Sequence, residues 1–178
     1  MLKNEEAAGN YTLWLLLCEE DEAWVKPLID ELAAELGTES FYPHATLMSG
    51  LSGRGDRTEA AVRDFASAHG VVETGIAGIE FLPETFRAFF LRLESHPALM
   101  EMYAQAAVWC DEAPPSEFMP HVSLVYGQPD VEAKKALEAR LRDRIQGRSL
   151  RLDRLAYVYS GKGIAVSDWR IEYSFDLS

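Results

Sequence analysis

Apolar residues recur along the chain at two spacings, which together predict alternating strands and helices. Spacings of three and four predict amphipathic helices over residues 22–36, 58–69, 97–111 and 131–146. Short apolar or alternating runs predict strands over residues 11–18, 44–51, 76–82, 88–94, 121–126, 150–160 and 169–177. Gly37 ends the first helix, a hairpin turns around Pro83-Glu84, and Pro114-Pro115 breaks the chain before the fifth strand. This mixture predicts an α+β fold.

The order of these elements repeats along the chain. After one leading strand, helix–strand–helix–strand–strand occurs twice, and the short strands that begin at His44 and His121 lie 77 positions apart. The same shift moves Ile76 onto Asp153, inside a later predicted strand. We therefore expect one domain, residues 1–178, built of two lobes related by a pseudo-two-fold axis. Each lobe should hold a mostly antiparallel sheet flanked by helices, with the active site in the cleft between the lobes.

Both short strands begin within the same sequence motif. The first motif reads Phe41-Tyr42-Pro43-His44-Ala45-Thr46-Leu47, and the second reads Phe118-Met119-Pro120-His121-Val122-Ser123-Leu124. Residues two apart on a strand share a face, so each histidine should point to the same side as the hydroxyl residue that follows it. Proline suits the first position of a strand because it lacks an N–H. If the lobes face each other, two imidazoles and two hydroxyls converge on the cleft.

These four side chains indicate phosphodiester chemistry without a metal. Two imidazoles can serve as a general base and a general acid near neutral pH, and hydroxyls can donate to phosphoryl oxygens. One histidine would deprotonate water and the other would protonate the departing ribose oxygen. The duplication makes the two histidines chemically alike, so the sequence leaves their roles open. Two neutral ligands without a nearby carboxylate make a poor zinc site, so no metal is expected.

The two motifs resemble those of the 2H phosphoesterase superfamily, which is marked by two H-x-[ST]-hydrophobic motifs in a bilobal fold. The motif form and compact length look most like cyclic phosphodiesterases that act on 2′,3′-cyclic nucleotides or ADP-ribose 1″,2″-cyclic phosphate. The resemblance implies that His44 and His121 are catalytic, that Thr46 and Ser123 bind phosphate, and that no cofactor is used. The implied product is the 2′-phosphate, or the 1″-phosphate for ADP-ribose. Tyr126 is similar to an aromatic residue that can line the family's pocket, but its odd offset from His121 predicts the opposite face unless a bulge intervenes.

The charge of the chain bears on its partners. There are 17 basic and 29 acidic residues, for a net charge of −12, which favours a small nucleotide-type substrate over a long nucleic acid. The cleft itself should then be less negative than the rest of the protein. Eight basic residues fall between positions 134 and 154, but acidic neighbours dilute them, which favours a solvated helix face. RNA-end processing, by a 2′-5′ ligase-like enzyme or an oligonucleotide phosphodiesterase, and non-catalytic nucleotide binding are the alternatives.

The remaining features indicate a cytoplasmic monomer. No apolar run is long enough for a membrane span, and Cys18 and Cys110 are expected to be thiols. The glycine-rich stretch 160–163 lacks the spacing of a phosphate-binding loop and is interpreted as a turn. Three tryptophans are expected in the core, whereas the place of Trp14 stays open. The three are Trp24, Trp109 and Trp169.

Overall fold

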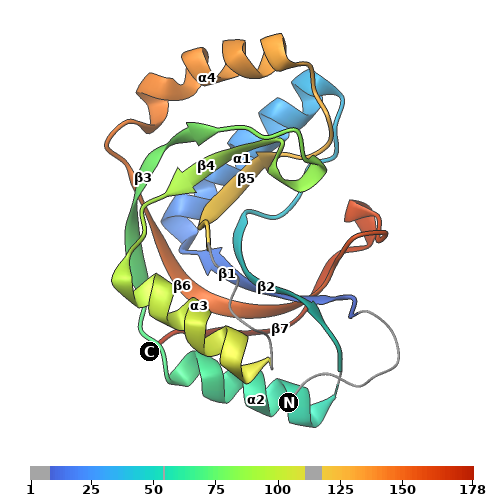
Figure 1. The fold of residues 1–178 in the computed structure, drawn as a ribbon, viewed down its shortest axis with the longest axis vertical. Helices are drawn as coiled ribbons and strands as arrows, with labels where there is room; N and C mark the ends of the chain where they lie inside the picture. The colour runs from blue at the N-terminus through green and yellow to red at the C-terminus, as the bar shows by residue number, and fades with distance from the viewer. Residues whose placement is uncertain (1–8, 54, 111–117) are drawn as a thin grey trace.

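The computed structural model describes residues 9–53, 55–110 and 118–178 (Figure 1). The strands in these residues are β1 (Tyr11–Leu17), β2 (His44–Leu51), β3 (Val72–Glu80), β4 (Phe89–Leu93), β5 (His121–Val125), β6 (Ser149–Tyr159) and β7 (Arg170–Asp176). The α-helices are α1 (Glu19–Leu36), α2 (Asp56–Ser67), α3 (Pro97–Trp109) and α4 (Val131–Ile145). Every predicted element is present, and the α+β class is confirmed. The predicted break at Pro114-Pro115 and the last position of the third predicted helix lie outside the described residues.

The strands join into one antiparallel sheet that closes on itself. Its order is β1-β2-β5-β4-β3-β6-β7, and β1 also pairs with β6. Six strands therefore form a ring, with β7 attached to the outer edge of β6. The ring has few free strand edges, because each of its six members has a partner on both sides along at least part of its length.

Strand pairing divides the internal repeat differently from the division predicted above. The pairing of β1 with β2 corresponds to that of β4 with β5, and the pairing of β6 with β1 corresponds to that of β3 with β4. The two repeats are thus β1-α1-β2-α2-β3 and β4-α3-β5-α4-β6, and the added strand is β7 at the end. The expectation of a leading strand outside the repeat was wrong, because the order of elements fits both divisions and only the pairing distinguishes them.

Each repeat contributes to both lobes. Helix α1 packs on β5 and α4 packs on β3, so these helices cover the lobe of β3, β4 and β5 (Figure 1). Helix α3 packs on β2, and α2 packs on β6 and β7, on the opposite side of the molecule. Because the chain crosses between the lobes within each repeat, neither lobe is formed by a continuous segment.

Strand β1 separates the main core from the cleft. Leu13, Leu15 and Leu17 are fully buried in the large apolar core beneath the helices. Trp14 and Leu16 belong instead to a small cluster on the other face of the sheet. This alternation has the period of two that a strand imposes, and it leaves the second face available to build a site.

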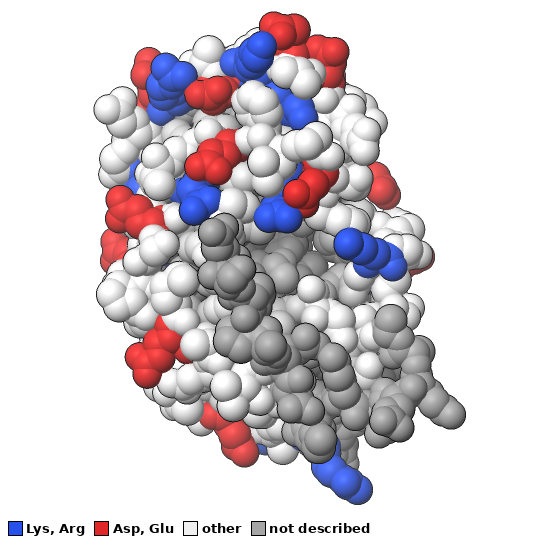
Figure 2. Space-filling model, viewed as in Figure 1, with Lys and Arg blue, Asp and Glu red and all other residues white. Residues whose placement is uncertain are grey.

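The arginines of the basic stretch that lie on α4 form an ion-paired helix surface. Arg140 Nη2 lies 2.6 Å from Glu35 and Arg144 Nη1 lies 3.6 Å from Glu31, which joins α4 to α1. Within α4, Arg142 lies 2.9 Å from Glu138. Figure 2 shows basic and acidic side chains interspersed over this part of the molecule. The predicted solvated face is therefore present, with much of its positive charge opposed by nearby carboxylates.

Two further expectations concern cysteines and membranes. Cys18 is half-buried and Cys110 is buried, and both are thiols, as predicted. Among the described helices, none combines the length and the apolar character needed to cross a bilayer.

Replacing Leu15 by alanine should destabilise the fold strongly. Leu15 is fully buried on β1, which pairs with β2 on one side and with β6 on the other. Leu15→Ala leaves a cavity and should lower the free energy of unfolding by about 2–5 kcal/mol. Val108→Ala is the control, because Val108 is 76% exposed and its loss should cost about 0.5 kcal/mol or less. Urea denaturation measures both, and equal effects would contradict this account of the core.

Candidate active site

The two histidine motifs line one cavity of about 640 Å³. All five residues predicted for the site are in its wall, namely His44, Thr46, His121, Ser123 and Tyr126. They come from β2, from β5 and from the position after β5, so both repeats supply the cavity.

A direct contact between β2 and β5 brings the motifs together. Ala45 pairs with Val122 in an antiparallel register, and both of these side chains point into the main core. The register therefore places His44 across from Ser123 and Thr46 across from His121, on the opposite face. Each imidazole thus lies beside the hydroxyl of the other motif.

Both imidazoles are held in the same way by the backbone. Nδ1 of His44 lies 2.7 Å from the carbonyl oxygen of Tyr42, and Nδ1 of His121 lies 2.9 Å from that of Met119. A carbonyl oxygen only accepts, so Nδ1 donates in each ring and Nε2 of the neutral ring carries the lone pair. The repeated motif therefore presents two equivalent Nε2 atoms.

Burial keeps both imidazoles neutral at neutral pH. Burial lowers the pKa of His44 to about 3; the hydrogen bond to Tyr42 opposes this shift, and the nearby His121 adds to it. Burial also lowers the pKa of His121; the bond to Met119 opposes this, and Arg87 and Arg92 add to it. Either histidine needs a nearby negative charge to become a proton donor.

An aromatic side chain lies beside each histidine. Trp14 stacks on His44 with ring centroids 3.5 Å apart and an interplanar angle of 9°. Phe90 meets His121 edge-on at 5.0 Å. Trp14 pairs with Thr46 and Phe90 pairs with Ser123, so the two aromatics occupy equivalent positions of the repeat. The place of Trp14, left open by the sequence, is the wall of the cavity.

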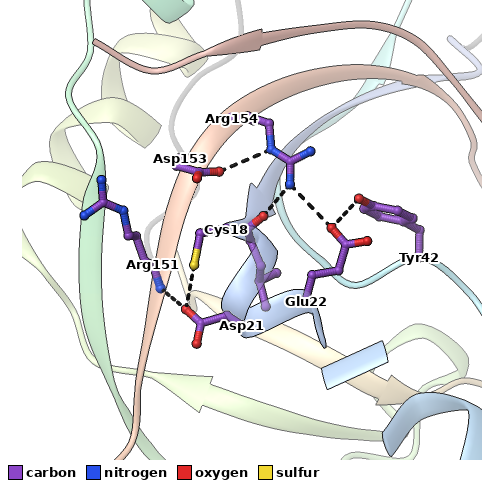
Figure 3. Close-up of polar contacts among 8 residues, drawn as sticks. Cys18, Asp21, Glu22, Tyr42, Arg151, Asp153 and Arg154 are labelled. Carbon is purple, nitrogen blue, oxygen red and sulfur yellow. Dashed lines mark hydrogen bonds and ion pairs between the residues drawn. The ribbon is translucent and has the colours of Figure 1, made fainter. Parts of the chain in front are cut away.

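A polar network supports only one of the two histidines. The hydroxyl of Tyr42 donates to Glu22, which also lies 3.4 Å from Arg154 Nη2 (Figure 3). The same Nη2 donates to the carbonyl of Leu17 at 2.6 Å. This network anchors the residue whose carbonyl holds His44. Met119, the counterpart of Tyr42, has no hydroxyl for such an anchor.

A bulge turns Tyr126 towards the cavity. The register of β4 with β5 skips one residue between Ser123 and Val125, so the alternation of faces is reset. Tyr126 then lines the cavity and stacks on Phe41 with centroids 3.8 Å apart. The sequence predicted that Tyr126 could face the cavity only if a bulge intervened, and that bulge is present. The equivalent shift between β1 and β2 brings Ser49 to the cavity wall.

Several residues of the cavity wall were not predicted, among them Trp169 and the turn at 160–163. Trp169 was expected in the core, but β7 begins at Arg170, so Trp169 precedes the strand and its indole lines the cavity. It meets Trp14 and Tyr126 edge-on, each at 5.7 Å. The turn at 160–163 is present, yet Ser160, Gly161 and Lys162 also line the cavity. Periodicity does not distinguish these positions from ordinary core and turn residues.

The cavity is less negative than the protein as a whole, as predicted. Of the described residues, its wall holds two that are basic, Arg87 and Lys162, and one that is acidic, Glu84. Glu84 lies 2.7 Å from Arg87, which opposes its charge. Within the described residues, no group of three or more His, Cys, Asp or Glu side chains is arranged to hold a metal ion.

Comparison with known proteins defines the class. Residues 19–163 match the family profile described as the 2'-5' RNA ligase superfamily. The chain therefore belongs to the 2'-5' RNA ligase superfamily, the group of the 2H phosphoesterases, as its motifs predicted.

Individual relatives support the same class. A cyclic phosphodiesterase of Arabidopsis thaliana is 29% identical over 153 residues, which cover 82% of each chain. The structure of E. coli LigT with 3'-AMP is similar with a TM-score of 0.56, 11% identity and coverage of 97% of this chain and 99% of that one. The structure of TT0787 of Thermus thermophilus has a TM-score of 0.54, 17% identity and coverage of 94% and 97%. These two structures establish the similarity of fold.

Stability should depend on the neutral state of His44. Because burial lowers its pKa from 6.5 to about 3, the unfolded chain binds a proton more readily than the native protein. The contribution to stability is present above the unfolded pKa. It is lost as the pH falls from 6.5 towards 3, so the free energy of unfolding should fall over that range.

Urea unfolding at pH 7, 6, 5 and 4 would measure this dependence. His44→Asn removes the titrating group and should make the dependence shallower. His69→Asn is the control, since that ring lies outside the cavity and bonds to Phe65 and Gln105. Identical slopes for His44→Asn and the unmodified protein would show that burial of His44 does not govern the loss.

Proposed function

We propose that this protein hydrolyses a cyclic phosphodiester of ribose. The substrate is a 2′,3′-cyclic nucleotide, giving the 2′-phosphonucleotide, or ADP-ribose 1″,2″-cyclic phosphate, giving the 1″-phosphate. The observation that carries the proposal is the pair of imidazoles whose Nδ1 atoms are both tied to the backbone, each beside a hydroxyl of the other motif. The similarity to a plant cyclic phosphodiesterase and to LigT, which has been crystallised with 3'-AMP and with ATP, supports a nucleotide substrate.

The proposed reaction uses the two Nε2 atoms in opposite roles. One neutral imidazole takes a proton from water while the water oxygen attacks phosphorus. The bond from phosphorus to the 3′ oxygen breaks, and that oxygen takes a proton from the second imidazole, which is protonated. One water molecule is consumed, and exchange of a proton with solvent restores both rings. No metal is required for any of these proton transfers.

The substrate itself can supply the charge that the acid needs. Both pKa values are lowered by burial, so neither free histidine carries at neutral pH the extra proton that a general acid must donate. A phosphodiester anion between them favours the charged imidazolium and raises its pKa. This coupling would protonate one histidine when substrate binds.

The hydroxyls would hold the non-bridging phosphoryl oxygens. Thr46 faces the cavity beside His121. Ser123 donates to the carbonyl of Phe86 at 3.0 Å, and rotation of its hydroxyl hydrogen would redirect that bond to phosphate. Donors aimed at these oxygens stabilise the charge that builds up in the transition state.

Aromatic side chains of the cavity would receive the nucleobase. Phe86, Tyr126 and Trp169 line the same wall and contact one another edge-on or at a tilt. Aromatic faces bind bases by stacking with little dependence on sequence. RNA-end processing, the alternative that the family description favours, would need a cationic path for a polynucleotide. The arginines of α4, Arg140, Arg142 and Arg144, form ion pairs instead.

Each histidine should be essential for this reaction. In buffer with EDTA, His44→Ala and His121→Ala should each lower turnover of a 2′,3′-cyclic nucleotide by about 10²–10⁴-fold, because each removes one proton-transfer step. His69→Ala should retain the activity, since its ring lies outside the cavity. Phosphorus NMR of the product should show the 2′-phosphate. Activity retained by either cavity variant would refute paired acid–base catalysis.

A further inference from the structure

One end of the cavity is lined by polar groups that the proposed reaction does not use. Thr12 on β1, Ser49 on β2, Ser160 after β6 and Lys162 in the following turn all lie in its wall. We call these four residues the hydroxyl–lysine end. They come from the lobe that contains β1, β2 and β6.

The pseudo-two-fold repeat shows that the fold does not require a hydroxyl at the position of Thr12. By the strand registers, Ala88 is the counterpart of Thr12, and Tyr126 is the counterpart of Ser49. Ala88 is fully buried and Thr12 is 6% exposed, so the same kind of position is filled by a methyl group in one lobe and by a hydroxyl in the other. The two ends of the cavity therefore share the same backbone arrangement but differ in the side chains at equivalent positions.

The buried hydroxyls leave one donor without an acceptor among the described residues. Oγ1 of Thr12 and Oγ of Ser160 are hydrogen-bonded to each other, and Ser160 is 2% exposed. Two hydroxyls carry two hydrogens, but the bond between them uses one. Neither side-chain oxygen forms another hydrogen bond within the described residues, so the second hydrogen has no acceptor there. An acceptor on a bound molecule would satisfy it.

Lys162 brings a positive charge to the same place. Within the described parts of the chain, no carboxylate is close enough to form an ion pair with it. The one acidic residue of the cavity wall, Glu84, is paired with Arg87 in the connection between β3 and β4. An ammonium group and hydroxyl donors that line one cavity are a combination that recognises phosphate oxygens.

The spacing from the reaction centre fits a second group on the same nucleotide. Thr12 lies two residues before Trp14 on β1, about 7 Å along the strand, and Trp14 pairs with Thr46. One ribose can bridge such a separation. We propose that the hydroxyl–lysine end binds a second phosphoryl group of the substrate, across the ribose from the cyclic phosphate. This inference rests on the proposed function, and it makes the substrate a ribose cyclic phosphate that also carries a 5′-phosphoryl group.

Binding of product-like ligands tests the subsite without requiring turnover. Adenosine 2′,5′-bisphosphate should bind about tenfold more tightly than adenosine 2′-monophosphate, as measured by calorimetry, because it adds charged hydrogen bonds. In Lys162→Gln the ratio of the two affinities should fall from about ten to between about one and three. Thr12→Val, which keeps the volume and removes the hydroxyl, should also reduce it. Lys135→Gln is the matched control, because Lys135 pairs with Glu132 on α4 outside the cavity.

Two results would overturn the subsite. The first is equal affinity of the unmodified protein for the two ligands. The second is a Lys162→Gln variant that weakens both ligands by the same factor, since that would mean a general effect of charge. Failure of the proposed function would look different: cyclic phosphates with and without a 5′-phosphate would both remain intact, while the bisphosphate kept its advantage in binding.

Discussion

Strands β2 and β5 meet at a single residue pair, Ala45 with Val122, and the arrangement of the site depends on this contact. The small apolar side chains of the pair point into the core, so the residues on either side of them point into the cavity. The contact lies on the pseudo-two-fold axis and closes the ring of strands opposite the pairing of β3 with β6. It therefore joins the lobes and juxtaposes two histidines that lie far apart in the sequence.

The same contact explains why the histidines are so strongly desolvated. His44 and His121 lie where β2 meets β5, so each has a paired strand on both sides, and the aromatic rings of Trp14 and Phe90 cover them further. A buried imidazole without a carboxylate partner favours its neutral form. Glu84 raises the pKa of His121, but burial outweighs it, so a bound anion would favour the imidazolium more than the protein alone does. Binding and protonation are thus physically linked in the cavity.

Much of the fold and the centre of the site could be predicted because both depend on local sequence patterns, namely the spacing of apolar residues and the two histidine motifs. The motifs around His44 and His121 occur in equivalent strands, and the rule that alternate residues share a face places Thr46 and Ser123 beside them. The division of the repeat could not be predicted, since pairing between distant strands decides whether β1 or β7 is the added element. Trp169 could not be assigned either, because an alternating pattern does not say at which residue a strand begins. Lys162 lies in a turn, where no periodicity relates it to the cavity.

A symmetric fold must lose part of its symmetry to act on an asymmetric molecule. The strand plan, the bulges and the hydrogen bonds of the histidines are shared by both halves. The differences include side chains at equivalent positions: Tyr42 against Met119, Thr12 against Ala88, and Ser49 against Tyr126. If the proposed reaction is correct, these differences decide which way the ribose lies, and the direction of the ribose decides which histidine meets the attacking water. The backbone geometry that both repeats share would then orient the two imidazoles for proton transfer. The residues that differ between the repeats would determine which imidazole acts as the base and which as the acid.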